Sequence, residues 1–131
     1  MKFIEYKNYY EVDGLKCHWN FWLLPERFIA ITLFGHIFFN ISKEEVYKYL
    51  ITKNGKITLN HERIHTIQAK SFKTKYLGFY IYYISYWIRN LFVYGTKDII
   101  AYLNIPFERE ANDKEHDFDY KETNWWNYCD K

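Results

Sequence analysis

The sequence predicts a mainly helical α+β fold, organised as a single domain over residues 1–131. A run rich in β-branched and aromatic residues, Arg27–Asn40, predicts two short strands that form a hairpin. After this run, helix start and stop signals recur to about His116. A chain of this length can bury a hydrophobic core without disulfide bonds.

The hairpin and the first helix have recognisable boundaries. Pro25 disfavours a helix through the segment before the hairpin, and Gly35 marks a turn or bulge within it. Ser42 can cap the next helix, and Glu45 three positions later completes a capping box. We expect this helix to continue to about residues 50–53.

A second helix is expected after a turn at Asn54-Gly55. It begins at Thr58 or Asn60, because either side chain can cap it, and it extends to roughly residues 72–73.

Three further helices are predicted in the second half of the chain. An aromatic helix begins at about Tyr76 and stops at Gly95, and residues 97–103 form a short helix. Pro106 suits a first helical turn, so the last helix carries residues 107–112.

Composition and charge exclude some classes of function. The formal net charge is +2, and the basic residues are spread along the chain, which disfavours nucleic-acid binding. Cys17 and Cys129 lie far apart in the sequence and are expected to be free thiols. The start of the chain, Met1–Lys7, lacks the apolar run of a signal peptide, so a cytoplasmic or membrane-peripheral location is expected.

Aromatic residues make up 23% of the chain, enough to fill a core, line a groove or contact a membrane interface. The most apolar stretch, Leu77–Tyr94, is interrupted by Arg89 and Asn90. It therefore predicts a buried or interfacial helix rather than a spanning one. The pair Trp125-Trp126 predicts either an interfacial anchor or packing on the domain.

The motif His61-Glu62-Arg63-Ile64-His65 carries the chemistry. On a helix, two histidines four residues apart lie on one face, where both imidazoles can bind one Zn²⁺. Glu62 points away from the metal ligands and can take a proton from a zinc-bound water. The expected cofactor is therefore zinc, with Glu62 as the general base.

A catalytic zinc site needs a third protein ligand. A short-spaced third histidine would fall at residue 71, where the chain has Ser71. Glu108 is favoured, because Ala111 lets two helices approach closely and Asn112 can hydrogen-bond a zinc histidine. Glu110 is the main rival, and the other acidic or imidazole candidates downstream are Asp113, Glu115, His116 and Asp117.

These residues carry a resemblance to the gluzincin metallopeptidases, whose third ligand lies in a Glu-x-x-Ala-Asp motif. Small bacterial proteins that pair His-Glu-x-x-His-x-x-Gln with Pro-Phe-Glu-x-Glu-Ala are the most similar, since Gln68 and Pro106–Ala111 match both patterns. The resemblance implies a minimal zincin-like domain that hydrolyses peptides or proteins. It also implies that the strands around Ile29–Phe39 form a sheet edge beside the motif helix, where an extended substrate pairs. Asn112 departs from the Asp of the motif.

Other functions remain open at this stage. The main alternative is a non-catalytic, zinc-stabilised domain that binds a protein partner or a membrane surface; a metal-free interfacial protein is a third. No motif locates the group that stabilises the oxyanion, and the candidates are Tyr80, Tyr82, Tyr83 and Tyr86. His18 and His36 are expected to be ordinary structural histidines.

Overall fold

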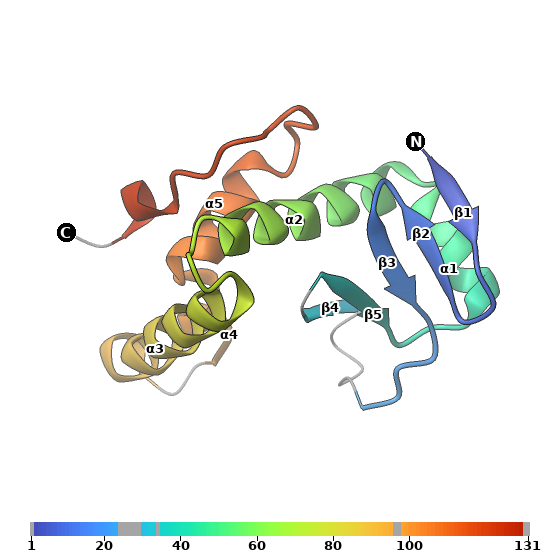
Figure 1. The fold of residues 1–131 in the computed structure, drawn as a ribbon. Coiled ribbons are helices and arrows are strands. Elements are labelled where there is room, and N and C mark those ends of the chain that lie inside the picture. Colours follow the sequence, from blue (N-terminus) through green and yellow to red (C-terminus); the bar gives the residue numbers. More distant parts are fainter. Residues whose placement is uncertain (1, 24–29, 34, 96–97, 130–131) are drawn as a thin grey trace. The chain divides into compact units, whose positions relative to one another are not determined.

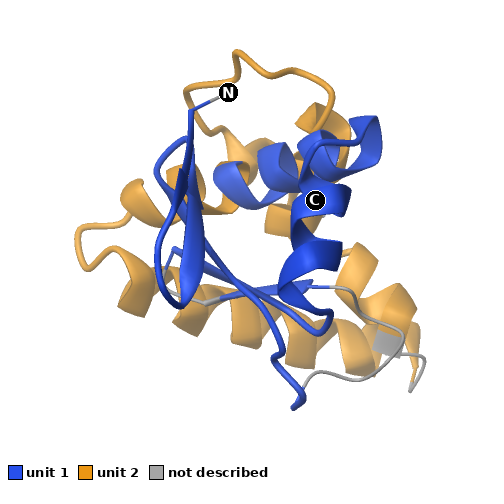
Figure 2. Cartoon of the chain, turned by 90° about the vertical axis from the view of Figure 1, so that its right-hand side faces the viewer, with its two compact units in different colours: residues 1–63 blue, residues 64–131 orange. Residues whose placement is uncertain are grey.

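The computed structural model describes residues 2–23, 30–33, 35–95 and 98–129. The chain divides into two compact units, residues 1–63 and residues 64–131, which Figure 2 shows in blue and orange. The boundary between them falls inside one continuous helix, α2 (Lys53–Lys70). The predicted α+β class is confirmed, because helices and one five-stranded sheet make up the described chain.

Unit 1 is built on the sheet. Its strands are β1 (Phe3–Glu5), β2 (Tyr9–Val12), β3 (Leu15–His18), β4 (Ala30–Leu33) and β5 (His36–Phe39). Their order is β1-β2-β3-β5-β4, and only β3 and β5 pair in parallel (Figure 1). Strand β4 therefore forms one edge of the sheet.

The predicted hairpin is confirmed in β4 and β5, which pair antiparallel. Gly35 connects them with a φ of 82°, a left-handed conformation that favours glycine. Pro25 lies outside the described residues. A second hairpin, β2–β3, turns at Asp13-Gly14, where φ is 51° and 87°. Two residues with positive φ between antiparallel strands match the twist of a hairpin.

The core of unit 1 lies on one face of the sheet. Alternate residues on β2, β3 and β5 are buried, as the two-residue period of a strand requires. They pack with residues of α1 (Lys43–Leu50) and of the first half of α2. The buried members are Tyr10, Val12, Leu15, Cys17, Ile37, Phe39, Val46, Leu50 and Leu59.

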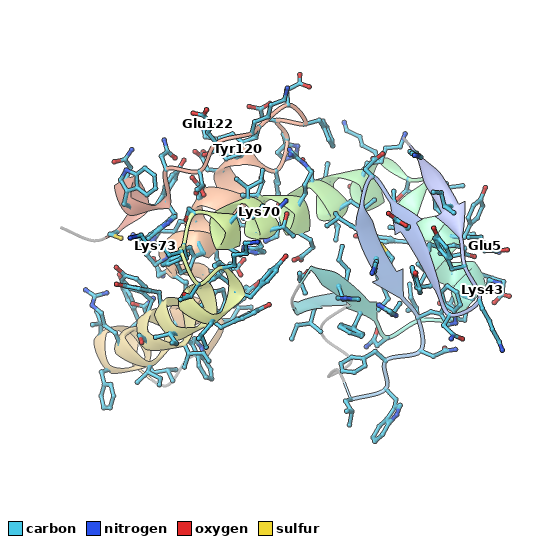
Figure 3. All side chains as sticks on the ribbon, in the orientation of Figure 1. Glu5, Lys43, Lys70, Lys73, Tyr120 and Glu122 are labelled. Carbon is cyan, nitrogen blue, oxygen red and sulfur yellow. The ribbon has the colours of Figure 1, made fainter. Side chains whose placement is uncertain are left out.

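The start of helix α1 follows the sequence signal. The Ser42 hydroxyl accepts a hydrogen bond from the Glu45 backbone N–H at 3.3 Å and donates one to the Glu45 carboxylate at 3.1 Å. The first bond is the N-cap expected of Ser42, and the second joins it to the Glu45 side chain that the capping-box pattern also names. Lys43 at the first turn also pairs with Glu5 on β1 at 3.3 Å, and both are labelled in Figure 3. That pair is exposed and contributes little to stability.

Helix α2 begins earlier than predicted, so the turn expected at Asn54-Gly55 is wrong. The Thr52 hydroxyl accepts a hydrogen bond from the Gly55 N–H at 3.0 Å and caps the helix. A Cβ on Gly55 would lie 1.8 Å from the Tyr49 carbonyl oxygen. Glycine is therefore present because two helix ends approach closely, not because the chain turns there.

Unit 2 contains the second half of α2 and four further elements: α3 (Tyr76–Tyr94), α4 (Asp98–Leu103), α5 (Pro106–Lys114) and the 3₁₀ helix η1 (Trp125–Tyr128). The expected signals hold at Gly95, which ends α3 with a φ of 83°, and at Pro106, which begins α5. The Asn90 amide of α3 donates to the Ala101 carbonyl at 3.0 Å, so α3 and α4 lie side by side (Figure 1).

Aromatic rings dominate the core of unit 2. Phe107 lies at its centre, with its ring centroid 4.8 Å from those of Phe79 and Trp125. Trp125 also stacks on Phe72, which confirms the packing alternative for this residue, while Trp126 is more than half exposed. None of the helices in the described ranges is long and apolar enough to cross a bilayer.

Candidate metal centre

Two histidines and one glutamate come together on α2 and α5. His61 and His65 lie one turn apart on α2, and Glu108 lies in the first turn of α5. One ligand atom from each of the three residues lies within 4.8 Å of the other two. The His65 Nε2 atom is 3.1 Å and 3.2 Å from the two carboxylate oxygens of Glu108. Among the described residues, this is the group of metal-binding side chains close enough to hold an ion.

The start of α5 holds Glu108 in place. Pro106 occupies the first helical position, where its missing N–H is not needed. Glu108 then falls in the first turn, where the helix dipole favours a negative charge. Its neighbours on α5, Phe107 and Ala111, are fully buried.

Gln68 fixes the orientation of His65. The Gln68 amide nitrogen donates to the Phe107 carbonyl at 2.9 Å and to the Glu110 carboxylate at 2.8 Å. Both of these groups only accept hydrogen bonds, so the Gln68 oxygen must face His65 Nδ1, which lies 2.8 Å away. His65 Nδ1 therefore carries a proton, and in neutral His65 the Nε2 lone pair points toward Glu108.

Glu110 anchors this arrangement rather than joining the metal group. Its buried carboxylate accepts hydrogen bonds from Gln68, Tyr120, Thr123 and the Asn124 backbone N–H, at 2.6 to 2.8 Å. Figure 3 labels Tyr120 in this region. Burial and the bond to Glu110 raise the pKa of Tyr120, so it remains a donor at neutral pH. These four donors occupy both oxygens of the carboxylate.

Tyr83 is the tyrosine that reaches the metal group. Its hydroxyl donates to the Glu108 carboxylate at 2.6 Å. The other three candidates lie elsewhere: Tyr80 packs on Phe79, and Tyr82 is about half exposed. Tyr86 contacts the Cys129 thiol at 3.3 Å, and this hydrogen bond, with burial, raises its pKa to about 12.

Glu62 is held from the sheet. Its carboxylate accepts a hydrogen bond from the hydroxyl of Thr32 on the edge strand β4. The nearby Cys17 is free and buried, and burial with the Glu62 charge raises its pKa to about 12. Cys17 is thus neutral and does not compete as a metal ligand at neutral pH.

Several residues singled out by the sequence lie away from this group. Asn112 is exposed on α5, and His65 Nδ1 donates its hydrogen bond to the Gln68 side-chain oxygen. The His18 and His36 rings face each other across β3 and β5, with 2.9 Å between their nitrogens. His116 is exposed, 3.8 Å from its neighbour Glu115.

Sequence reasoning assigned Gln68 no role of its own and did not single out Tyr83 among four tyrosines. The Gln68 signal was available, because a residue three positions after His65 lies next to it on a helix. Tyr83 depends on how α3 packs against α5 and has no such local signal. Comparisons of the chain with protein-family models, with curated proteins and with solved structures find no match.

Proposed function

We propose that this chain is a zinc-dependent metallopeptidase with His61, His65 and Glu108 as zinc ligands and Glu62 as the general base. The grouping of the three ligand side chains carries the proposal. Two imidazoles and one carboxylate are a ligand set of catalytic zinc, and they leave a fourth position for water or substrate. The donor atoms present therefore fit the metal.

The tautomer of His65 strengthens the fit. With Nδ1 donating to Gln68, neutral His65 turns the lone pair of Nε2 toward both oxygens of Glu108. Two electron-rich groups 3.1 to 3.2 Å apart attract each other only through a cation or a proton. A divalent ion shared by these atoms removes the repulsion between them.

Zinc, when bound, lowers the pKa of a water molecule and polarises the scissile carbonyl. Glu62 follows the first ligand directly in sequence, and its role is to accept the proton of the attacking water and pass it to the leaving amine. Thr32 positions Glu62 through the hydrogen bond from β4. A structural zinc site would have no use for a base at this position.

Tyr83 is the group we assign to oxyanion stabilisation. Its hydroxyl already lies at hydrogen-bond distance from the ligand Glu108. A donor next to a zinc ligand can turn to the oxygen on which negative charge develops. Its hydrogen bond also orients Glu108 before substrate arrives.

An extended peptide is the substrate that we propose. Strand β4 is at the sheet edge, and its residue Thr32 contacts the general base. Backbone groups at a sheet edge can pair with an added strand, which brings a peptide bond alongside the catalytic helix. Within unit 1, the contact from Thr32 to Glu62 supports this proposal of a peptide paired at β4.

The test is the Glu62→Gln variant with a fluorescently labelled unfolded protein as substrate. We expect zinc content to stay unchanged while kcat falls about 10²-fold or more, because the amide cannot accept a proton. Glu44→Gln is the matched control, since Glu44 is an exposed carboxylate on α1. Full hydrolysis by zinc-loaded Glu62→Gln would overturn the mechanism.

A further inference from the structure

Helix α3 presents an apolar side that the other described residues of unit 2 leave exposed. Helical positions advance by about 100° per residue, which places five of its exposed residues on one side. They are between 47% and 87% exposed, whereas apolar side chains on a helix normally face the core. We call this set the α3 stripe: Leu77, Ile81, Ile84, Ile88 and Phe92.

The opposite side of α3 is already occupied. Phe79 and Asn90 are buried there, and Phe79 belongs to the aromatic core of unit 2. Asn90 also bonds the backbone of α4. The helix is therefore fixed along one side within unit 2, and the α3 stripe on its other side is left exposed.

Amphipathic aromatic residues border the α3 stripe on both flanks. Tyr82 and Trp87 lie roughly 100–120° around the helix from the centre of the stripe, on opposite sides. Their rings are 48% and 38% exposed. Tyr and Trp prefer the boundary between the apolar and aqueous parts of a membrane, so an aliphatic centre with aromatic flanks matches a lipid surface.

The charges around α3 favour an anionic surface. Residues 64–95 contain four basic residues and no acidic residue: Lys70, Lys73, Lys75 and Arg89. Lys70 and Lys73, labelled in Figure 3, are exposed at the end of α2 and in the turn before α3. A second copy docked stripe to stripe would bring these like charges together, which opposes self-association.

We propose that the α3 stripe docks this protein on an anionic lipid bilayer, with α3 lying along the surface. The aliphatic residues enter the boundary of the acyl chains, Tyr82 and Trp87 lie at the headgroup level, and the lysines contact anionic headgroups. This inference is independent of the proposed hydrolytic activity, because it uses no residue of the metal group.

The experiment is flotation of the full chain with vesicles of phosphatidylcholine, with and without phosphatidylglycerol. We expect binding to vesicles that contain phosphatidylglycerol, weakened by added salt. The double variant Ile84→Gln, Ile88→Gln should bind the vesicles at least about tenfold more weakly than wild type, because it removes apolar area from the stripe. Ile51→Gln is the matched control, since Ile51 is 50% exposed in unit 1 and should leave binding unchanged.

A second pair, Ile81→Gln with Phe92→Gln, repeats the test if the first variant does not fold. Absence of wild-type binding, or equal binding by wild type and a folded stripe variant, overturns the proposal. A concentration-dependent dimer that a stripe variant abolishes, without vesicle binding, would assign the stripe to a second copy of the chain instead. Each readout is vesicle binding or association, so an inactive enzyme would not affect the result.

Discussion

Helix α5 places two glutamates two residues apart, and their surroundings give them different roles. Glu110 is fully buried and accepts four hydrogen bonds. Glu108 is also buried, but it faces the His65 imidazole and the Tyr83 hydroxyl and belongs to the group of three metal-binding side chains. The same residue type on the same helix thus serves as an internal anchor at one position and as a ligand candidate at the other.

The difference shows what distinguishes a metal ligand from a structural carboxylate in a buried site. Donors that saturate a carboxylate stabilise its charge and leave no lone pair for a metal. A carboxylate that faces an imidazole lone pair instead leaves a position that a cation can fill. Gln68 connects the two, because it donates to Glu110 and accepts from His65.

The largest expected effect is on stability. Glu110→Gln puts an amide N–H₂ group among groups that all donate, so we expect the free energy of unfolding to fall by about 3 kcal/mol or more. Urea denaturation of the metal-free chain measures this loss. Glu108→Gln is the control on the same helix and should lose clearly less; equal losses would remove the distinction between the two glutamates.

The next effect is on metal affinity through Gln68. Gln68→Met removes the acceptor that fixes the His65 tautomer, and we expect zinc affinity to fall by about 10- to 100-fold. Competition with a coloured chelator gives the affinity. Asn112→Ala should leave it unchanged because Asn112 is exposed. If Asn112→Ala lowered zinc affinity and Gln68→Met did not, Asn112 would be the residue that hydrogen-bonds a zinc histidine, as the sequence first predicted.

A variant of Tyr83 distinguishes a role in orienting Glu108 from a role in stabilising the oxyanion. Tyr83→Phe should lower kcat about tenfold or more, because a donor for the developing oxyanion is lost. Zinc affinity should change less than kcat, and Tyr82→Phe, one position away and half exposed, should change neither. If Tyr83→Phe instead lowers zinc affinity and leaves kcat intact, the hydroxyl only orients Glu108.

Cys17 is a third buried acid, and its surroundings favour the neutral form. Its thiol lies against the Leu15 carbonyl and near Glu62, and its pKa rises from 9.0 to about 12. Since the folded pKa is the higher one, stability from Cys17 is complete below pH 9 and is lost as the pH rises toward 12. We expect wild type to lose about 1 kcal/mol more than Cys17→Val over the first pH unit above 9. Parallel pH profiles of the two proteins would contradict this.

Local signals in the sequence predicted much of the fold. Ser42, Gly95 and Pro106 act through a few neighbouring residues, and each marks the helix end that was expected. The hairpin turn at Asp13-Gly14 carried a signal of the same kind, although the strands on either side of it were not predicted. The turn predicted at Gly55 was wrong, because glycine is required there by a close contact with the preceding helix. No local sequence pattern reveals such a contact.

The candidate site divides in the same way. The spacing of His61 and His65 identifies two candidate ligands, because a helix alone fixes their relation. The preference for Glu108 over Glu110 agrees with the arrangement in the structure, although both are buried. The partners of Glu110 come from residues 120–124 and those of Glu108 from α3, so they depend on tertiary packing.

We propose that His61, His65 and Glu108 together bind one zinc ion. The most direct measurement is the metal content of the metal-depleted chain after incubation with zinc and removal of unbound metal. We expect one zinc per chain for wild type and for the folded fraction of Glu110→Gln. The zinc content should fall strongly in His61→Ala and Glu108→Ala. No zinc in wild type, or an undiminished content in Glu108→Ala, would contradict it.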